Sequence, residues 1–551
     1  MSNVTIKYDG RAIGAKDAFT AEFGNTAAIS DSAEVLERDG VAFANYGNPL
    51  ETYSVALDGR DATLPPTVSD NVGVKSEQLS GADGVFAVPP TLTLSASELF
   101  ASQGITLRFD DSHDIYATEV NIKWYRDDTL LETADFEPDA PFFICFKAVE
   151  LFNKIVITFG KINLPYNRLT LRAVDFGAIV EFDGGEIVNV SVTQQVDPLS
   201  AEITIDTVDF NIRANKNVDY LFEKSQPFTV LFRGELIATT FVSEVRQTGY
   251  RRWSIKSEGY ISFLESVDFP GGMYSGQDVA ELIADIFATA RVPYSLADDF
   301  EGMTVSGYIP YTTCRAALAQ VAFAIGATVS AAYNDKVRIF KLSETASQSI
   351  PLSRIMQGQS TSDNARVTAV EVYAHSYSQG TETVRLYTAD DGIGNGIEVR
   401  FDEPMHSLTI SNGTIVKSGA NFAIINAASG CTLTGKKYIH GMVAKRKANP
   451  LVLANDLENV VTVKDATLVS VANVDTVLEK CYNYYTGRKK ATFQIVEGRH
   501  STDTGMVTDQ AVKVGERIGY ATENSGERSG VVVRQSYSLN GGILLKNTEV
   551  V

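Results

Sequence analysis

The sequence predicts a multidomain, mainly β protein, in which a β-sandwich and β-barrels accompany one inserted α/β unit. Three observations indicate this fold class. The chain has 551 residues, more than a single hydrophobic core usually accommodates. Short runs that alternate apolar and polar residues, each bounded by turn residues, recur along most of its length. Two consecutive segments with helical periodicity are found only within residues 270–343.

Residues 1–87 are expected to form a strap or linker segment, because short strands alternate there with turn-rich polar stretches and residues 62–84 are polar. Residues 88–177 predict the β-sandwich. Strand-length runs with period-two alternation follow one another between turns in this part of the chain. These runs are Ile105–Phe109, Val120–Tyr125, Ile155–Phe159 and Leu169–Val174.

Residues 178–269 predict a first β-barrel, since four further strand-length runs are separated by turn signals. These runs are Ile187–Val192, Ala201–Ile205, Phe228–Phe232 and Arg252–Lys256.

Residues 270–343 predict two helices packed on a small sheet. Ser275 is expected to cap the first helix, in which one face is apolar at Val279, Leu282, Ile283, Ile286 and Phe287. The second helix is expected to begin near Thr312 and to end at Gly326. It should bury Leu318, Val321, Ala322 and Ile325. A hairpin follows, with strands Val329–Tyr333 and Val337–Phe340 and a turn at Asn334–Asp335.

Residues 344–551 predict a second barrel region that contains one helix. The helix is indicated by apolar and aromatic residues on one side, which are Val474, Val477, Leu478, Cys481, Tyr482 and Tyr485. Barrel strands are expected near the C-terminus at Val512–Ile518, Ser529–Arg534 and Ile543–Leu545.

The composition is that of a folded, acidic protein. Apolar residues make up 44% of the chain, which is ample for hydrophobic cores, and the formal net charge is −20. Such a surface repels phosphate backbones, so we expect no direct nucleic-acid binding. No run of 18 apolar residues occurs and the N-terminus lacks the regions of a signal peptide. We therefore expect no stable membrane insertion, and folding in a cytoplasm.

The sequence contains no motif that indicates catalysis. HExxH, Walker A and GxSxG patterns are absent, and Gly392–Gly396 lacks the spacing and the following helix of a phosphate-binding loop. The five histidines are scattered, and the four cysteines form no CxxC pair. We therefore expect no enzymatic activity, no cofactor and no metal site. A turn with Asp110, Asp111 and Asp114 would suit calcium, but solvated turn acids are the favoured interpretation.

Three aromatic residues of the predicted sandwich are candidates for stacking on a sugar ring: Tyr125, Trp124 and Tyr116. Trp124 falls on the same strand face as Ile122 and Val120, which favours a place in the core. Tyr125 falls on the opposite face and is the better surface candidate.

Three stretches resemble phage tail proteins from Gram-positive hosts and their prophages. The first is Pro49–Gly59, which ends in Leu-Asp-Gly. The second runs from Ile155 through Pro165-Tyr166 to Gly177 and continues at Val196–Glu202. The third is Ile309–Leu318 followed by Ala322–Ala327, which is similar to a helix that precedes a hairpin in baseplate hub proteins. Together they cover about residues 45–345.

This resemblance implies a tail-tip or baseplate hub. Hub-type β-barrels would assemble as a homo-oligomer, often a trimer, and join the tail tube to a spike or fibre in the virion tail. Residues 88–177 also look like a galactose-binding-type sandwich. The alternative is therefore a carbohydrate-binding adhesin, with cell-surface glycan as partner and host attachment as its role. No peptidoglycan-cleaving motif is present, so lysin activity is not expected.

Overall fold

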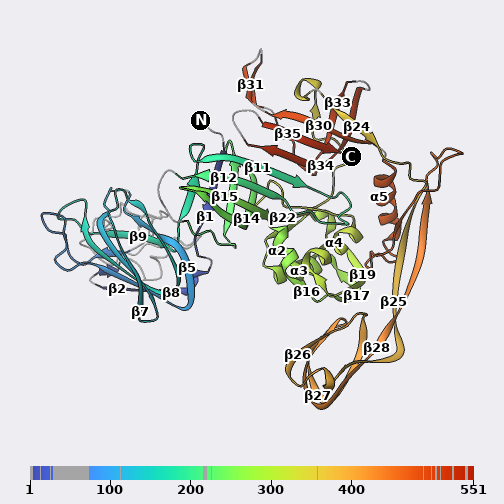
Figure 1. The fold of residues 1–551 in the computed structure, drawn as a ribbon, viewed down its shortest axis with the longest axis horizontal. Coiled ribbons are helices and arrows are strands. Elements are labelled where there is room, and N and C mark those ends of the chain that lie inside the picture. The colour runs from blue at the N-terminus through green and yellow to red at the C-terminus, as the bar shows by residue number, and fades with distance from the viewer. Residues whose placement is uncertain are drawn as a thin grey trace, which may run out of the picture.

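The computed structural model describes residues 4–551 except 13, 25, 29–73, 112, 215–219, 225, 357, 488, 498, 503–504, 509, 524–525 and 540–543. Within these residues the protein is mainly β and multidomain, as the sequence predicts. A sandwich lies at one end, a large sheet and an α/β unit lie in the centre, and a long β-arm lies at the other end (Figure 1). The stretch Pro49–Gly59 and most of the predicted linker lie outside the described residues.

The sandwich is an eight-stranded antiparallel sheet that folds over itself, and helix α1 (Ala15–Ala18) packs on it. Its strands are β2 (Thr20–Gly24), β3 (Thr26–Ala28), β4 (Val74–Ser76), β5 (Thr91–Phe109), β6 (Ala117–Arg126), β7 (Thr129–Phe136), β8 (Phe142–Ile162) and β9 (Thr170–Asp175). The long strands β5 and β8 pair near both of their ends, with irregular register between. One irregularity contains Gly104, where φ is 155° and an added Cβ would lie 2.2 Å from the carbonyl oxygen of Cys145. Only glycine fits this bend.

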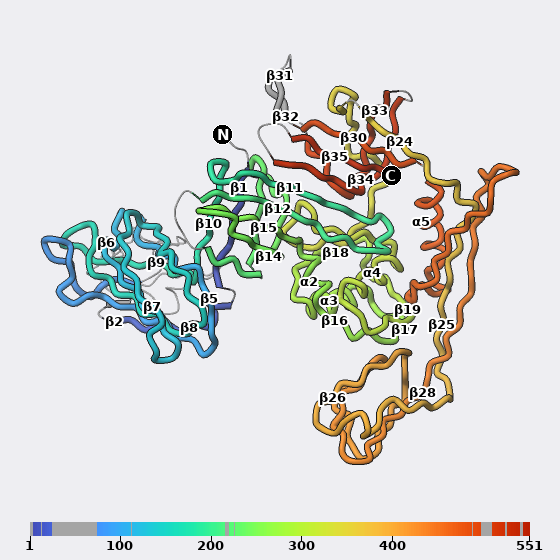
Figure 2. The backbone as a smooth tube through the Cα atoms, in the orientation of Figure 1, coloured from blue at the N-terminus to red at the C-terminus, as the bar shows by residue number. Residues whose placement is uncertain are grey.

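A second sheet of thirteen strands forms the centre of the molecule (Figure 2). Its first half contains β1 (Val4–Asp9), β10 (Ile179–Phe182), β11 (Ile187–Gln195), β12 (Thr207–Arg213), β13 (Pro227–Phe232), β14 (Glu235–Gly249) and β15 (Arg252–Gly259). Strand β1 lies between β10 and β13, so the start of the predicted strap is an integral strand of the first barrel-like unit.

The second half of this sheet comes from the end of the chain. It contains β23 (Ser349–Ile350), β24 (Ser360–Asp363), β30 (Lys489–Glu497), β33 (Arg517–Thr522), β34 (Gly526–Ser538) and β35 (Leu544–Val550). A 3-10 helix, η4 (Leu352–Arg354), lies between β23 and β24, and a separate hairpin follows β30, with strands β31 (Arg499–Thr502) and β32 (Gly505–Thr508). The two halves meet where β11 pairs with β34.

The strand predicted at Ala201–Ile205 is wrong, because these residues are irregular in the structure. Ile203 is buried in the core of the α/β unit, and its carbonyl accepts a 2.6 Å hydrogen bond from Arg315 Nε. Tertiary contacts with the neighbouring unit therefore replace the strand pairing that the local alternation suggested.

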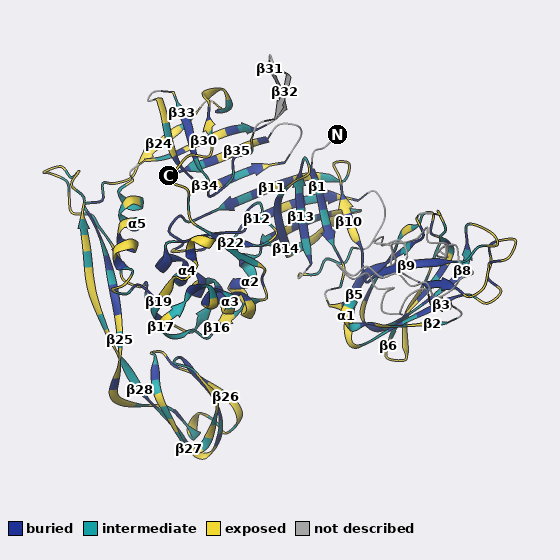
Figure 3. Ribbon diagram, turned by 180° about the vertical axis from the view of Figure 1, so that it is seen from behind, coloured by how far each residue is buried: buried dark blue, intermediate teal, exposed yellow. Residues whose placement is uncertain are grey.

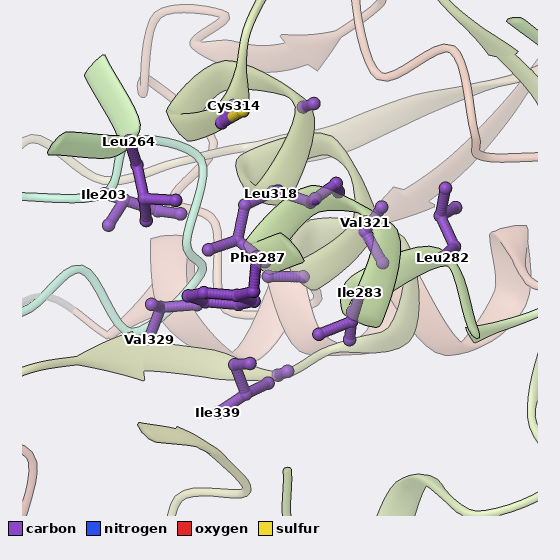
Figure 4. Close-up of a cluster of buried hydrophobic side chains, with 14 of the residues drawn as sticks. Ile203, Leu264, Leu282, Ile283, Phe287, Cys314, Leu318, Val321, Val329 and Ile339 are labelled. Carbon is purple, nitrogen blue, oxygen red and sulfur yellow. The ribbon is translucent and has the colours of Figure 1, made fainter. Parts of the chain in front are cut away.

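The α/β unit has the two helices that the sequence predicts, packed with a three-stranded sheet. Helix α3 (Val279–Ala290) is capped by Asp278, which accepts from two backbone N–H groups, and not by Ser275. Helix α4 (Cys314–Ile325) is capped by Thr313 and ends at Gly326 in the left-handed conformation. Figure 4 shows the two apolar stripes meeting in one core.

The smaller elements of this unit complete its core. They are α2 (Ile261–Ser266), β16 (Asp268–Phe269), β17 (Gly272–Asp278), β18 (Tyr294–Leu296), the 3-10 helix η3 (Asp298–Phe300), β19 (Thr304–Ile309), β20 (Thr312–Thr313), β21 (Thr328–Ser330) and β22 (Val337–Phe340). Strands β21 and β22 form the predicted antiparallel hairpin, and β18 adds to β22 in parallel.

A long β-arm separates the two parts of the second barrel region in the sequence. It consists of β25 (Ala369–Thr388), the 3-10 helix η5 (Ala389–Asp391), β26 (Gly394–Arg400), β27 (Met405–Ser418), β28 (Phe422–Ala448) and β29 (Val460–Val463). Helix α5 (Val474–Thr486) packs against β25 through Val474, Val477, Leu478 and Cys481, the side that the sequence indicates. Residues 344–551 thus form two structures, a barrel half and this arm. Local alternation is the same in both, which is why the sequence did not separate them.

Candidate functional site

The two barrel-like halves meet at one junction within the chain, and we call the β11–β34 pairing and the side chains around it the seam. Five residue pairs join the strands, from Ser191 with Ser538 to Gln195 with Arg534. The two strands are more than 330 residues apart in sequence, since Gln194 and Tyr537 differ by 343 positions. The seam turns two units into one continuous sheet.

Buried polar side chains cross the seam and fix its geometry. Tyr537 Oη donates to Gln194 Oε1 at 3.1 Å, and Gln194 Nε2 donates to the carbonyl of Ile237 at 2.9 Å. Both Gln194 and Gln535 are fully buried. Tyr333, from the turn between β21 and β22, donates to Gln535 Oε1 at 2.9 Å. The α/β unit is therefore tied to both halves of the sheet, and a buried network satisfied in this way specifies one arrangement of the three units.

One buried ion pair lies beside this network. Lys546 Nζ lies 2.9 Å from Glu497 Oε2, donates to the carbonyl of Val512 at 2.9 Å, and approaches Tyr333 Oη at 3.2 Å. Burial lowers the pKa of Lys546, while Glu497 opposes that shift. Burial also raises the pKa of Tyr333, so its hydroxyl stays protonated and available as a donor.

A buried carboxyl, that of Asp206, contacts the last residue of β11 at one end of the seam. Asp206 is 4% exposed, and its Oδ1 accepts from the backbone N–H of Gln195 at 3.1 Å. Burial raises the pKa of Asp206 to about 7, and the hydrogen bond from Gln195 only partly offsets that rise. The sequence contains no local signal for this residue, because an aspartate before a strand looks like an ordinary turn acid.

The two ends of the thirteen-stranded sheet differ from its interior. Among the described strands, β10 pairs with β1 alone and β24 pairs with β30 alone, and off this main path the two-residue β23 pairs with β33 alone. All four residues of β24 are exposed, and Ile179 and Glu181 of β10 are exposed as well (Figure 3). Each end therefore presents backbone groups to which a strand of another chain can bond.

The three aromatic candidates of the sandwich do not form one site. Trp124 is fully buried in the core, as its strand face indicates, so its ring has no surface for a sugar. Tyr125 is half-buried, with Lys154 Nζ 5.6 Å from its ring centroid. Tyr116 is nine residues away along an extended chain, which corresponds to roughly 30 Å. It too is half-buried, against the sandwich core.

The acidic turn of the sandwich is occupied by protein groups. Asp110 Oδ1 accepts from Arg172 at 2.9 Å, and Asp110 Oδ2 lies 3.0 Å from His113 Nδ1. Burial alone would raise the pKa of Asp110, but the contacts with Arg172 and His113 lower it. Asp111 and Asp114 are exposed. Within the described ranges, no group of three or more histidine, cysteine, aspartate or glutamate side chains is arranged to hold a metal ion.

The cysteines form no disulfide cross-links, and the described helices include no candidate membrane span. All four thiols are buried and form no disulfide. In the part of the chain that the structure describes, no helix has the length and apolarity needed to cross a membrane.

The sequence matches no protein-family profile. It also matches no curated protein. Solved structures similar to this chain include a tail protein from Neisseria meningitidis MC58, with 12% identity, a TM-score of 0.41, and coverage of 67% of this chain and 93% of that one.

Two further structures give the same picture. The 43 kDa tail protein of prophage MuSo2 from Shewanella oneidensis has 12% identity and a TM-score of 0.42, with 68% of this chain and 95% of that chain covered. The prophage tail protein gp18 from Listeria monocytogenes EGD-e has 10% identity and a TM-score of 0.39, with 67% and 91% covered. The predicted resemblance to tail proteins is confirmed only to the extent that these similar structures are tail proteins. At these values it does not assign a function, and Gram-positive hosts and a galactose-binding sandwich stay predictions.

Proposed function

We propose that this chain is a structural component of the tail tip or baseplate of a phage or phage-tail-like particle. Several copies would form a hub, a trimer by the sequence resemblance, that joins the tail tube to a spike or fibre. The observation that carries the proposal is the continuous sheet of two barrel-like halves, in which the strand at each end, β10 or β24, is paired on one side only among the described strands.

Two different edges at the ends of one continuous sheet suit a ring. A contact between unlike edges of neighbouring copies is heterologous, and such contacts close into a ring when the rotation between copies permits it. Here β10 of one copy would lie beside β24 of the next, so that each edge is covered. The buried network at the seam supports this role, because a ring needs a fixed angle between the two halves of every subunit.

The proposed role is structural and not catalytic. The buried polar groups of the seam are used in contacts between units, and the acidic turn of the sandwich is used by Arg172 and His113. We propose the virion tail as the location and other tail proteins as partners.

The test is the molar mass of the purified chain in solution by light scattering after size exclusion. The wild-type chain is expected to elute with about three times its chain mass of 59.8 kDa. Ile179→Lys on β10 and Thr361→Lys on β24 place a charge at the two sheet ends and should reduce that mass toward one chain.

Ile393→Lys is the matched control, because Ile393 is 63% exposed and lies in the arm, away from both sheet ends. This variant should keep the wild-type mass. A wild-type chain that stays monomeric at micromolar concentrations contradicts the proposal, as do edge variants that assemble like the wild type.

A further inference from the structure

The root of the arm, where residues 369–379 of β25 pair with residues 438–448 of β28, contains a direct contact between two histidines. His375 on β25 and His440 on β28 have nearly parallel rings, and His375 Nδ1 lies 2.8 Å from His440 Nε2. His375 is 3% exposed, whereas His440 is exposed. The bond needs one nitrogen to donate and the other to accept, so at least one of the two facing nitrogens must carry a lone pair.

This pair lies where the arm meets the α/β unit, through residues 464–469, which we call the arm joint. On the arm side, the backbone N–H of His375 donates to the carbonyl of Val469 at 2.7 Å. On the other side, Thr467 Oγ1 donates to the carbonyl of Tyr308 on β19 at 2.5 Å, and the N–H of Tyr308 donates to the Thr467 carbonyl at 3.3 Å. The joint therefore connects β25 with β19.

Two aromatic contacts connect the histidine pair to the α/β unit. The ring of Tyr377 stacks on His440 with centroids 4.6 Å apart, and Tyr308 lies 5.8 Å from Tyr377. Displacement of His440 would therefore also disturb the contact of Tyr377 with Tyr308.

We propose that the His375–His440 pair is a pH-sensitive contact that holds the arm root on the arm joint and releases it on acidification. When both rings are protonated, two N–H donors and two positive charges face one another across a hydrogen-bond distance. The rings must then separate, and the joint loosens with them. This inference does not depend on the proposed hub function.

The surroundings of the pair determine the direction of the effect. Burial lowers the pKa of His375, and the neighbouring His440 lowers it further. The backbone of Lys464 and the carboxylate of Asp465, both from the arm joint, act in the opposite direction but do not reverse the shift. From β25 and β19 the facing groups are Tyr377 and Tyr308, which burial keeps neutral by raising the pKa of each to about 12. Glu403 contributes to the shift of Tyr308.

A histidine with a lowered pKa resists protonation in the closed state. The released state, in which the arm root has left the arm joint, takes up the proton more readily. The free-energy difference that favours the closed state therefore decreases as pH falls below the ordinary histidine pKa of about 6.5. Between that value and the lowered pKa, each pH unit shifts the equilibrium toward release by up to about tenfold per proton.

Hydrogen–deuterium exchange of the full chain at pH 7.5 and pH 5.0 tests this, with rates corrected for the intrinsic effect of pH. Peptides that cover residues 369–379 and 464–469 are expected to exchange at least tenfold faster at pH 5.0, while the β21–β22 hairpin changes little. His440→Gln keeps an amide donor for His375 Nδ1 but cannot take up a proton. This variant should reduce the rise, because only His375, whose pKa burial still lowers, can then take up a proton.

His406→Gln is the matched control, because His406 lies on the same arm and its two ring nitrogens face Ser407 and the carbonyl of Gly380, not a second histidine. This variant should keep the full rise. The proposal is overturned if the wild-type arm root exchanges equally at both pH values, or if His440→Gln keeps the full wild-type rise. The wild-type comparison requires no variant, so the test stands even if a substitution impairs folding.

Discussion

Replacement of Asp206 by asparagine should stabilise the seam at alkaline pH. Asp206 is buried, and its pKa is raised by burial to about 7. In the unfolded chain the pKa of this carboxyl is near its ordinary value of 3.8. Between these two values the folded protein binds a proton that the unfolded chain has lost, so the stability of the wild type falls as pH rises.

The magnitude follows from the size of the shift. At about 1.4 kcal/mol per pKa unit, the full penalty is roughly 4 kcal/mol above pH 7 and roughly 1.5 kcal/mol at pH 5. Asp206→Asn removes the ionisation and keeps an oxygen that can accept from the Gln195 N–H. The variant should therefore gain roughly 2–3 kcal/mol on the wild type between pH 5 and pH 8. A constant cost of the new amide group cancels in this comparison.

Urea unfolding followed by tryptophan fluorescence measures the effect. The chain has two tryptophans, Trp124 in the sandwich and Trp253 on β15 of the first barrel-like half. In a Trp124→Phe background, Trp253 reports on the half that contains Asp206. Asp209→Asn serves as the control, because Asp209 is exposed on the adjacent strand β12. Parallel pH profiles for the wild type and Asp206→Asn would refute the reasoning.

Three further predictions concern the seam, the sandwich core and the sandwich surface. Lys546→Met leaves Glu497 buried without its cation and should cost roughly 3–5 kcal/mol in urea unfolding, whereas the double variant Lys546→Met/Glu497→Leu should recover most of that loss. Gly104→Ala forces a Cβ against the carbonyl of Cys145 and should destabilise the sandwich by at least about 1–3 kcal/mol, seen as a lower Tm of its transition. If the sandwich binds glycan, Tyr125→Ala should abolish the wild-type signal on a glycan array, and a wild type without any signal would contradict that alternative.

Only part of the candidate site could be predicted from the sequence. The alternation in Val120–Tyr125 correctly assigned Trp124 to the core, because period-two patterning determines which face of a strand a residue occupies. The same pattern gave no indication that Gln194, Gln535 and Lys546 are buried at the seam. Polar residues on a strand are normally expected on its solvent side, and only the neighbouring unit makes these sites interior.

Local patterns determined the elements that depend on local interactions. The apolar stripes of α3 and α4, the glycine that ends α4 and the inner side of α5 are all set by residues within a few turns of one another. The tertiary structure alone decided which strands are neighbours. The insertion of β1 between β10 and β13, the pairing of β11 with β34 and the approach of His375 to His440 join segments between 65 and more than 330 residues apart. The physical reason is that alternation specifies the buried face of a strand, whereas the backbone groups that select its neighbour are the same in every residue except proline.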